Sequence, residues 1–169
     1  GLDQIEIIGV NDANARMQAL LSGQLDYVER VSPRLAPLFK DNPSFKLQRF
    51  PTGEMNHIAF RTDIPPFDDY RVRKALRIAV DRQALINTAI GRGGAVVACD
   101  APVWPGDQYR LHRTCEQDQA EAKRLLAEAG FEDGLTFDLY TTGLFATGIP
   151  IAEVYQRQLA AIGVTVNIV

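Results

Sequence analysis

The sequence of 169 residues lacks the features that mark several functional classes. It has no excess of positive charge, since 18 basic residues stand against 21 acidic ones and the net charge is −3. A chain with this balance is not expected to bind nucleic acid or an anionic membrane surface. It also has no run of the roughly 18 to 20 apolar residues that a membrane-spanning helix requires. We therefore expect a soluble chain whose partner is not a polyanion.

Signals of secretion and of chain ends are also missing. The sequence does not begin with Met, and its first residues, GLDQIEIIGV, have the character of a strand and not of a signal peptide. The last residues, TVNIV, are apolar and β-branched, and such a strand normally requires neighbours with which to pair. We expect this chain to be part of a longer protein, with sequence missing on both sides.

The common catalytic motifs are absent as well. The sequence contains no nucleophile elbow, no phosphate-binding glycine loop, no HExxH zinc motif and no Cys/His dyad signature. The glycine-rich GRGG at 91–94 follows a predicted helix and not a strand, which argues against a nucleotide site. Asp68 and Asp69 are adjacent at a predicted helix start, where they are typical of caps and not of a catalytic carboxylate pair. The sequence predicts no enzyme and no cofactor.

What is present is the composition of an ordinary globular domain, with 46% apolar and 23% charged residues. We expect residues 1–169 to form a single domain, or most of one. Predicted strands alternate with predicted helices, which favours an α/β fold with a mixed sheet flanked by helices. The predicted strands cover 2–10, 25–31, 44–50, 55–62, 135–141 and the residues after Gly163, and the predicted helices follow Asn11, Ser32 with Pro33, Asp68 or Asp69, Asp81, Asp118 and the loop after 141.

The segment PPFDDYRVRKALRIAVDR (65–82) resembles the family of oligopeptide, dipeptide and nickel solute-binding proteins of ABC importers. Further similarities follow in the family's order at ARMQALLSGQLDYV (15–28), AFRT (59–62), EAKRLLAEAGF (121–131) and QLAAIGVTVNI (158–168). The resemblance implies a type II periplasmic-binding-protein-like fold. It also implies that the chain is most of the second, C-terminal lobe, with the first lobe and the end of the chain absent.

The resemblance implies a function without chemistry. A small peptide or similar polar solute is captured between two lobes and delivered to a membrane permease. The location that the resemblance implies is the periplasm, or the outer face of the cell membrane through a lipid anchor, and the fragment is expected to be monomeric. A ligand-sensing lobe of a receptor or regulator with the same fold is the main alternative, and an enzyme domain is the second. The solute itself is left open among peptides, nickel chelates, haem, glutathione and oligosaccharides.

The segment 65–82 that carries the resemblance is interpreted as structural. Its two prolines fix the approach of the chain, its carboxylates cap helix starts, and its arginines either pair back to those carboxylates or brace a loop. A phosphate-contacting basic helix is the weaker interpretation, because the two aspartates cancel its charge. The residues to which we assign this structural role are Pro66, Asp68, Asp69, Arg71, Arg73 and Asp81.

The resemblance implies that ligand contacts come from three places: residues 56–59, the loop after Ala101 and the loop after Tyr140. His57 occupies the position where peptide binders present an aromatic side chain, although a lone His in a strand is as often solvated or in the core. Trp104 offers a flat apolar wall with one N–H donor, the alternative being a buried anchor of its own loop.

The loop TTGLFATG (141–148) is uncharged, whereas dipeptide-binding relatives carry an Arg near this position that binds the ligand's carboxylate. This difference argues against a dipeptide ligand. Thr142 and Phe145 are contact candidates from this loop, with the lobe core as the alternative place for Phe145. The predicted ligand-binding residues are Asn56, His57, Trp104, Thr142 and Phe145.

The only two cysteines, Cys99 and Cys115, flank the loop that holds Trp104. In an exported protein such an isolated pair favours a disulfide, and closing a loop of this size stabilises the fold by about 3 kcal/mol. A zinc site made by His112, Cys115 and Cys99 is the alternative, but four ligands with standard spacing are not visible. We therefore predict the disulfide and no metal.

Overall fold

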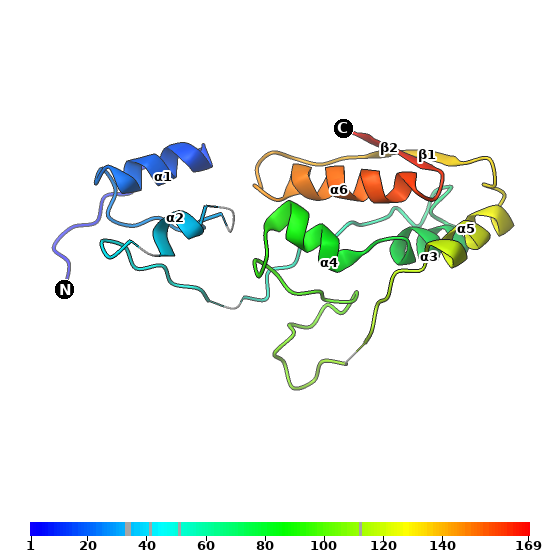
Figure 1. Cartoon of the computed structure of the whole chain (residues 1–169), viewed down its shortest axis with the longest axis horizontal. Helices are drawn as coiled ribbons and strands as arrows, with labels where there is room; N and C mark the ends of the chain where they lie inside the picture. Colours follow the sequence, from blue (N-terminus) through cyan, green and yellow to red (C-terminus); the bar gives the residue numbers. More distant parts are fainter. Residues whose placement is uncertain (33–34, 41, 51, 112) are drawn as a thin grey trace. The chain divides into compact units, whose positions relative to one another are not determined.

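The structure is a computed structural model that describes residues 1–32, 35–40, 42–50, 52–111 and 113–169. The chain forms two compact units, residues 1–47 and residues 48–169, which are described separately. Figure 1 shows the order of the elements along the chain. Within the described ranges, no helix has the length and apolar character that crossing a membrane requires.

The first unit contains α1 (Ala13–Leu21) and the short α2 (Pro37–Lys40). Asp12 caps α1 by accepting a hydrogen bond from the Ala15 N–H at 2.7 Å, so the cap lies one residue after the predicted Asn11. The carbonyl of Ser32 accepts the N–H groups of the third and fourth residues after it, as a helical turn requires, whereas the predicted Pro33 lies outside the described residues. Among the described residues of this unit, the buried side chains are those of Met17 and Phe39.

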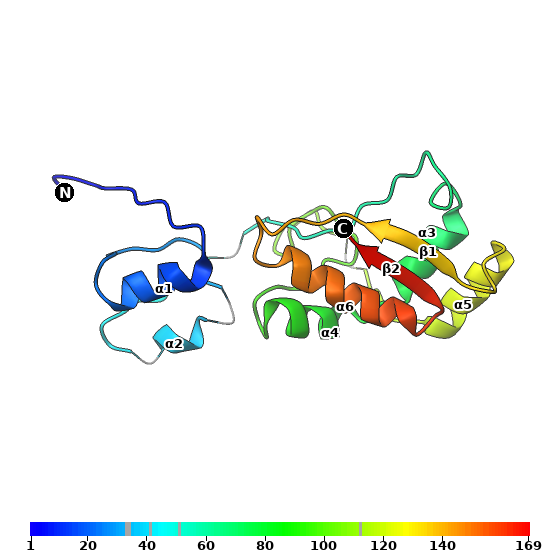
Figure 2. The ribbon, with the colours of Figure 1, turned by 90° about the horizontal axis from the view of Figure 1, so that it is seen from above.

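The second unit is built on a strand–helix–strand segment. Strand β1 (Leu135–Leu139) pairs in parallel with β2 (Val164–Ile168), with Leu135 opposite Val164. Parallel strands require a crossover, and α6 (Gly148–Ala160) supplies it. Figures 1 and 2 both show α6 lying along the two strands. The remaining elements are α3 (Tyr70–Ile78), α4 (Arg82–Leu85), the π-helical turn η1 (Ile86–Ile90) and α5 (Gln119–Glu128).

The core of this unit follows the alternation of the two strands. Side chains of β1 and β2 are alternately buried and exposed, so one face of the sheet is apolar and the other polar. Helix α3 packs against α5, and α6 packs against β2. These elements share a single cluster of buried side chains, which includes Val72, Leu76, Leu125, Leu126, Phe137, Tyr155, Leu159, Val164 and Val166.

The corner between α3 and α4 is fixed to α6 by paired amide hydrogen bonds. The Asp81 N–H donates to Gln158 Oε1 at 2.7 Å, and Gln158 Nε2 donates back to the Asp81 carbonyl at 3.1 Å. The Asp81 carboxylate caps α4 by accepting from the Ala84 N–H at 2.8 Å. These hydrogen bonds fix the corner to α6, close to the start of the loop that follows η1.

Four predicted strands are absent, which corrects the sequence analysis. Residues 2–10, 25–31, 44–50 and 55–62 contain no strand in the described structure, and the only sheet there is two-stranded and parallel instead of mixed. A strand requires a partner for its backbone groups, and an alternating pattern does not supply one. Ile58 and Phe60 still pack against the core without strand pairing. The single domain over 1–169 stays a prediction.

Candidate functional site

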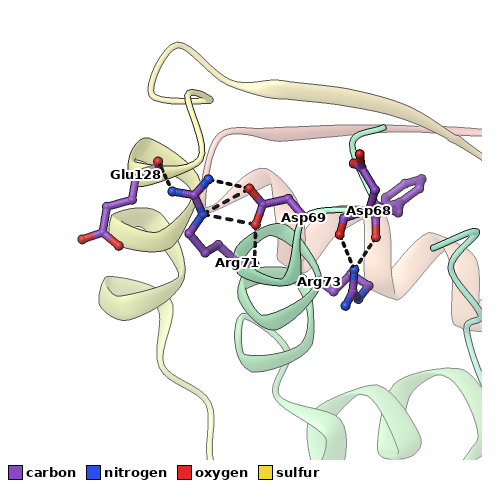
Figure 3. Close-up of polar contacts among 6 residues, drawn as sticks. Asp68, Asp69, Arg71, Arg73 and Glu128 are labelled. Carbon is purple, nitrogen blue, oxygen red and sulfur yellow. Dashed lines mark hydrogen bonds and ion pairs between the residues drawn. The ribbon is translucent and has the colours of Figure 1, made fainter. Parts of the chain in front are cut away.

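The segment 65–82 uses its charged groups within the fold. The Asp69 carboxylate caps α3 by accepting the Arg71 N–H at 2.7 Å, and it also binds the Arg71 guanidinium at 2.6 Å. Arg71 Nη1 donates in addition to the Glu128 carbonyl at 2.6 Å, where α5 ends (Figure 3). The hydrogen bond from Arg71 lowers the pKa of the Asp69 carboxyl below its ordinary value. These contacts tie the start of α3 to the end of α5.

Asp68 does not cap the helix, although it lies beside Asp69. Its backbone carbonyl accepts from Arg73 Nη1 at 2.9 Å, and the Phe67 carbonyl accepts from the same nitrogen at 2.6 Å (Figure 3). Arg73 therefore braces the backbone that leads into α3. The geometry supports the structural interpretation of this segment.

The loop that carries Trp104 is cross-braced at its base. A disulfide joins Cys99 to Cys115, whose Cα atoms are 5.4 Å apart. The Asp100 carboxylate accepts two hydrogen bonds from Arg82, at 2.8 and 3.0 Å, and one from Arg77 at 3.3 Å. Arg110 Nη2 donates to the Ala98 carbonyl at 2.9 Å, which links the outgoing and returning limbs of the loop. The described residues of this loop form no helix or strand, yet the base of the loop is held by a covalent bond and by side chains.

Burial and charge act in opposite directions on Asp100. Burial raises the pKa of the Asp100 carboxyl, but the hydrogen bonds and charges of Arg82 and Arg77 outweigh it, and the pKa lies below its ordinary value. Asp100 is therefore ionised at neutral pH and pairs with both arginines.

Trp104 lies at a tight turn near the tip of this loop. The Asp107 N–H donates to the Trp104 carbonyl at 3.0 Å, and the indole folds back over Gly106. A Cβ atom at Gly106 would lie 2.3 Å from the ring, so only glycine fits beneath it. The Trp104 side chain is 41% exposed, which means that it is neither a fully buried anchor nor free of its own loop.

Two of the three predicted contact regions meet in the structure. Thr147 Oγ1 donates to Asn56 Oδ1 at 3.0 Å, which joins the segment 56–59 to the loop 141–148. Gly148 begins α6 so close to this loop that a Cβ atom there would lie 2.8 Å from the Thr142 carbonyl. Asn56 and Thr142 are thus both held beside the N-terminus of α6.

The other predicted contact residues are accessible to solvent. His57 is exposed, and Phe145 is 56% exposed and lies outside the buried core, so the core alternative for Phe145 is not what the structure shows. Within the described ranges, no hydrogen bond or ring contact joins Trp104 to Asn56 or to the loop 141–148.

Sequence reasoning missed three residues that organise these loops: Thr147, Asp100 and Arg110. Thr147 had a detectable signal, because a Thr followed by Gly148 and Pro150 is a typical helix start. Its hydroxyl binds Asn56 and makes no capping hydrogen bond to α6. The hydrogen-bond partners of Asp100 and Arg110 lie 12 to 23 residues away in the sequence and depend on how the loop folds back, so no local sequence pattern predicts them.

Two hollows in the second unit do not coincide with the predicted contacts. One, of about 170 Å³, lies at the base of the disulfide loop and is lined by charged side chains that include Arg77, Arg82 and Arg113. The other, of about 370 Å³, lies beside the end of α5. Among the residues that the structure describes, no His, Cys, Asp and Glu side chains gather as a metal site requires, and His112 of the zinc alternative lies outside them.

Comparison with protein families gives a match over the whole chain. The family model described as bacterial extracellular solute-binding proteins, family 5 middle, matches residues 1–169. The glutathione-binding protein GsiB of Salmonella typhimurium is 31% identical over 168 residues, which are 99% of this chain and 32% of that protein. The Escherichia coli K12 protein of the same name is 27% identical over the same length. The chain therefore spans about a third of the length of these curated relatives.

Solved structures with the same fold include proteins that bind different ligands. A dipeptide-binding protein from Pseudoalteromonas, in complex with Met-Leu, is 26% identical with a TM-score of 0.78, over 94% of this chain and 32% of that one. NikA from Staphylococcus aureus, in complex with Ni(L-His)2, has a TM-score of 0.80 over 95% of this chain and 34% of that one. Its identity of 24% supports a shared fold alone.

Proposed function

Because this chain belongs to the bacterial extracellular solute-binding proteins of family 5, we propose that it is part of the substrate-binding component of an ABC importer. The predicted family and the α/β, periplasmic-binding-protein-like fold class are confirmed. The curated relatives carry the names of binding proteins and not of enzymes, and the family is extracellular by description. The match over all 169 residues is the observation that carries the proposal.

We propose that the solute is a small peptide or a similarly polar molecule. The groups that meet at the start of α6 are uncharged: the Asn56 amide, the Thr147 hydroxyl and the backbone around Thr142. Such groups bind a polar ligand through directed hydrogen bonds, and the exposed His57 and Phe145 extend the surface. Trp104 and its loop form the third contact region in this proposal.

The proposed mechanism is capture by closure of two lobes around the solute. The exposed contact residues form one wall, and the rest of the longer protein supplies the other. Closure removes the ligand from water and presents the closed form to a membrane permease. We propose that the protein works outside the cytoplasm, either free in the periplasm or held by a lipid anchor.

The first experiment identifies the solute. Native mass spectrometry of the full-length protein is expected to show a co-purified polar molecule, and calorimetry is expected to give binding of that molecule with no turnover. Asn56→Ala and Thr147→Val are expected to weaken binding, because each removes one partner of the hydrogen bond that fixes the contact loop. Arg124→Ala, on the exposed face of α5, is the matched control and is expected to leave affinity unchanged.

Two outcomes would contradict the proposal. Consumption of the solute by the purified protein would show an enzyme instead of a binding protein. Sub-micromolar affinity of residues 1–169 alone would show that closure between two lobes is not required for tight binding.

A further inference from the structure

The loop between η1 and α5 contains an unusual turn at Cys99 and Asp100. The Ala101 N–H donates to the Ala98 carbonyl at 3.1 Å, so Cys99 and Asp100 are the two central residues of a turn. Their φ angles are +51° and +61°. A turn with two positive φ angles at its centre normally contains Gly, Asn or Asp, so Asp100 suits this conformation whereas Cys99 is an uncommon residue for it.

The surrounding structure holds both central residues in this conformation. Cys99 is tied to Cys115 by the disulfide, and Asp100 is tied to the helix corner by Arg77 and Arg82. In the pair with Arg82, the terminal nitrogens Nη1 and Nη2 each donate to one carboxylate oxygen of Asp100, and such a two-point contact fixes the direction of the pair. Unfavourable backbone conformations persist where the surroundings over-determine them, and they are common at ligand contacts.

The position of this turn determines where Trp104 lies. Only three residues separate Asp100 from Trp104, and the backbone there has little freedom because Pro102 fixes its own φ and restricts Ala101 before it. Ala101 is buried and adds a packing contact at the start of this limb. On the returning limb, Arg110 binds the Ala98 carbonyl, which is itself the acceptor of the turn. The outgoing limb begins at this turn and the returning limb is hydrogen-bonded to it, so the turn holds both limbs.

We propose that Asp100 is a positioning residue, which through Arg77 and Arg82 holds the turn at 98–101 and so places Trp104 for contact with the solute. This inference rests on the proposed function and adds to it a residue that has no contact with the ligand itself. Removing the carboxylate releases the turn from α3 and α4 while the disulfide remains. The loop then samples other directions, and ordering it again on binding costs affinity.

The first test measures the loop without any ligand. In the full-length protein, Asp100→Asn keeps the shape of the side chain and removes its charge. Hydrogen–deuterium exchange of the peptide 101–111 is expected to be faster in Asp100→Asn than in the wild type. Arg124→Ala, which breaks exposed ion pairs on α5, is the control and is expected to leave exchange in this peptide unchanged. Equal exchange in the wild type and Asp100→Asn would overturn the proposal.

The second test asks whether Asp100 acts through Trp104. Calorimetry with reduced glutathione and with the dipeptide Met-Leu as probes is carried out on the wild type, Asp100→Asn, Trp104→Ala and the double variant. Asp100→Asn is expected to weaken binding about tenfold, within the range seen for coupled residues, and to have no further effect once Trp104 is absent. An equal loss in both backgrounds would overturn the positioning role. Failure of the wild type to bind either probe would count against the proposed ligand class, whereas the exchange experiment would still decide the role of Asp100.

Discussion

Gly106 determines where the single indole of the chain lies. The Trp104 ring covers it so closely that a methyl group at this position would overlap the six-membered ring. Gly106→Ala is therefore expected to displace the indole and to change the emission maximum and the acrylamide quenching of Trp104, which is the only tryptophan present in these 169 residues. Gly53→Ala is the control, because nothing lies within 4 Å of a Cβ atom there. An unchanged spectrum in Gly106→Ala would contradict the placement of the ring.

At the scale of single residues, the sequence predicts those contacts whose two partners lie close together in the chain. Asp69, Asp81 and Asp118 cap helices in the structure, because a capping side chain binds a backbone group only two or three residues ahead. Glu121 lies three residues after Asp118, where a capping box would have its side chain bind back to the helix start, but this side chain binds Arg124 and Lys74. Such a change of partner arises from tertiary contacts and leaves no trace in the local pattern.

At the scale of elements, Asp69 combines two contacts that stabilise α3. Asp69→Ala removes the cap and releases Arg71, which binds the end of α5. The expected loss is about 1 kcal/mol of the free energy of unfolding, measured by urea denaturation. Asp68→Ala is a matched control, because only the backbone carbonyl of Asp68 takes part, and it is expected to change stability by less than about 0.5 kcal/mol. Equal losses in the two variants would show that the cap is not the cause.

The ion pairs of Glu121, chiefly with Arg124 of the same helix, predict a dependence of stability on pH. Hydrogen bonds from Arg124, together with Lys74 of α3, lower the pKa of Glu121 from 4.5 to about 2. Because the pKa is lower in the folded state, the stabilisation is present above pH 4.5 and is lost as the pH falls toward about 2. Thermal unfolding between these values is expected to show a smaller loss in Glu121→Gln than in the wild type. Parallel curves for the two proteins would exclude this carboxylate as a source of acid sensitivity.

The sequence predicts elements well where the partner lies nearby in the chain. The strands at 135–139 and 164–168 and the helices between 70 and 160 satisfy their backbone groups within helices or with each other. Residues 2–10 mix apolar and polar side chains and residues 44–50 alternate cleanly, yet neither segment forms a strand, because strand formation requires a second segment as partner. For the same reason the contact between Asn56 and Thr147, which are 91 residues apart, was not predictable.

For the whole molecule, the disulfide stabilises the fold because it lowers the conformational entropy of the unfolded chain. It closes a loop of 16 residues in sequence separation, and replacing both cysteines by serine is expected to reduce the free energy of unfolding by about 3 kcal/mol. Denaturation of the oxidised protein, the reduced protein and the double serine variant checks this. The reduced protein and the variant are expected to agree, and a variant as stable as the oxidised protein would refute the effect.

The two-stranded sheet and α6 also bear on the order in which the chain folds. Strands β1 and β2 and the helix between them lie within residues 135–168, so their contacts close short loops with a small loss of chain entropy. The contacts of α3 with α5 join residues that are further apart in the sequence. Both helices also pack into the core cluster to which the segment 135–168 contributes. We therefore expect this segment to be structured in the folding transition state, with α3 and the disulfide loop assembling on it afterwards. A substitution that weakens the pairing of Val166 with Phe137 should consequently slow folding, whereas one at the tip of the loop should chiefly speed unfolding.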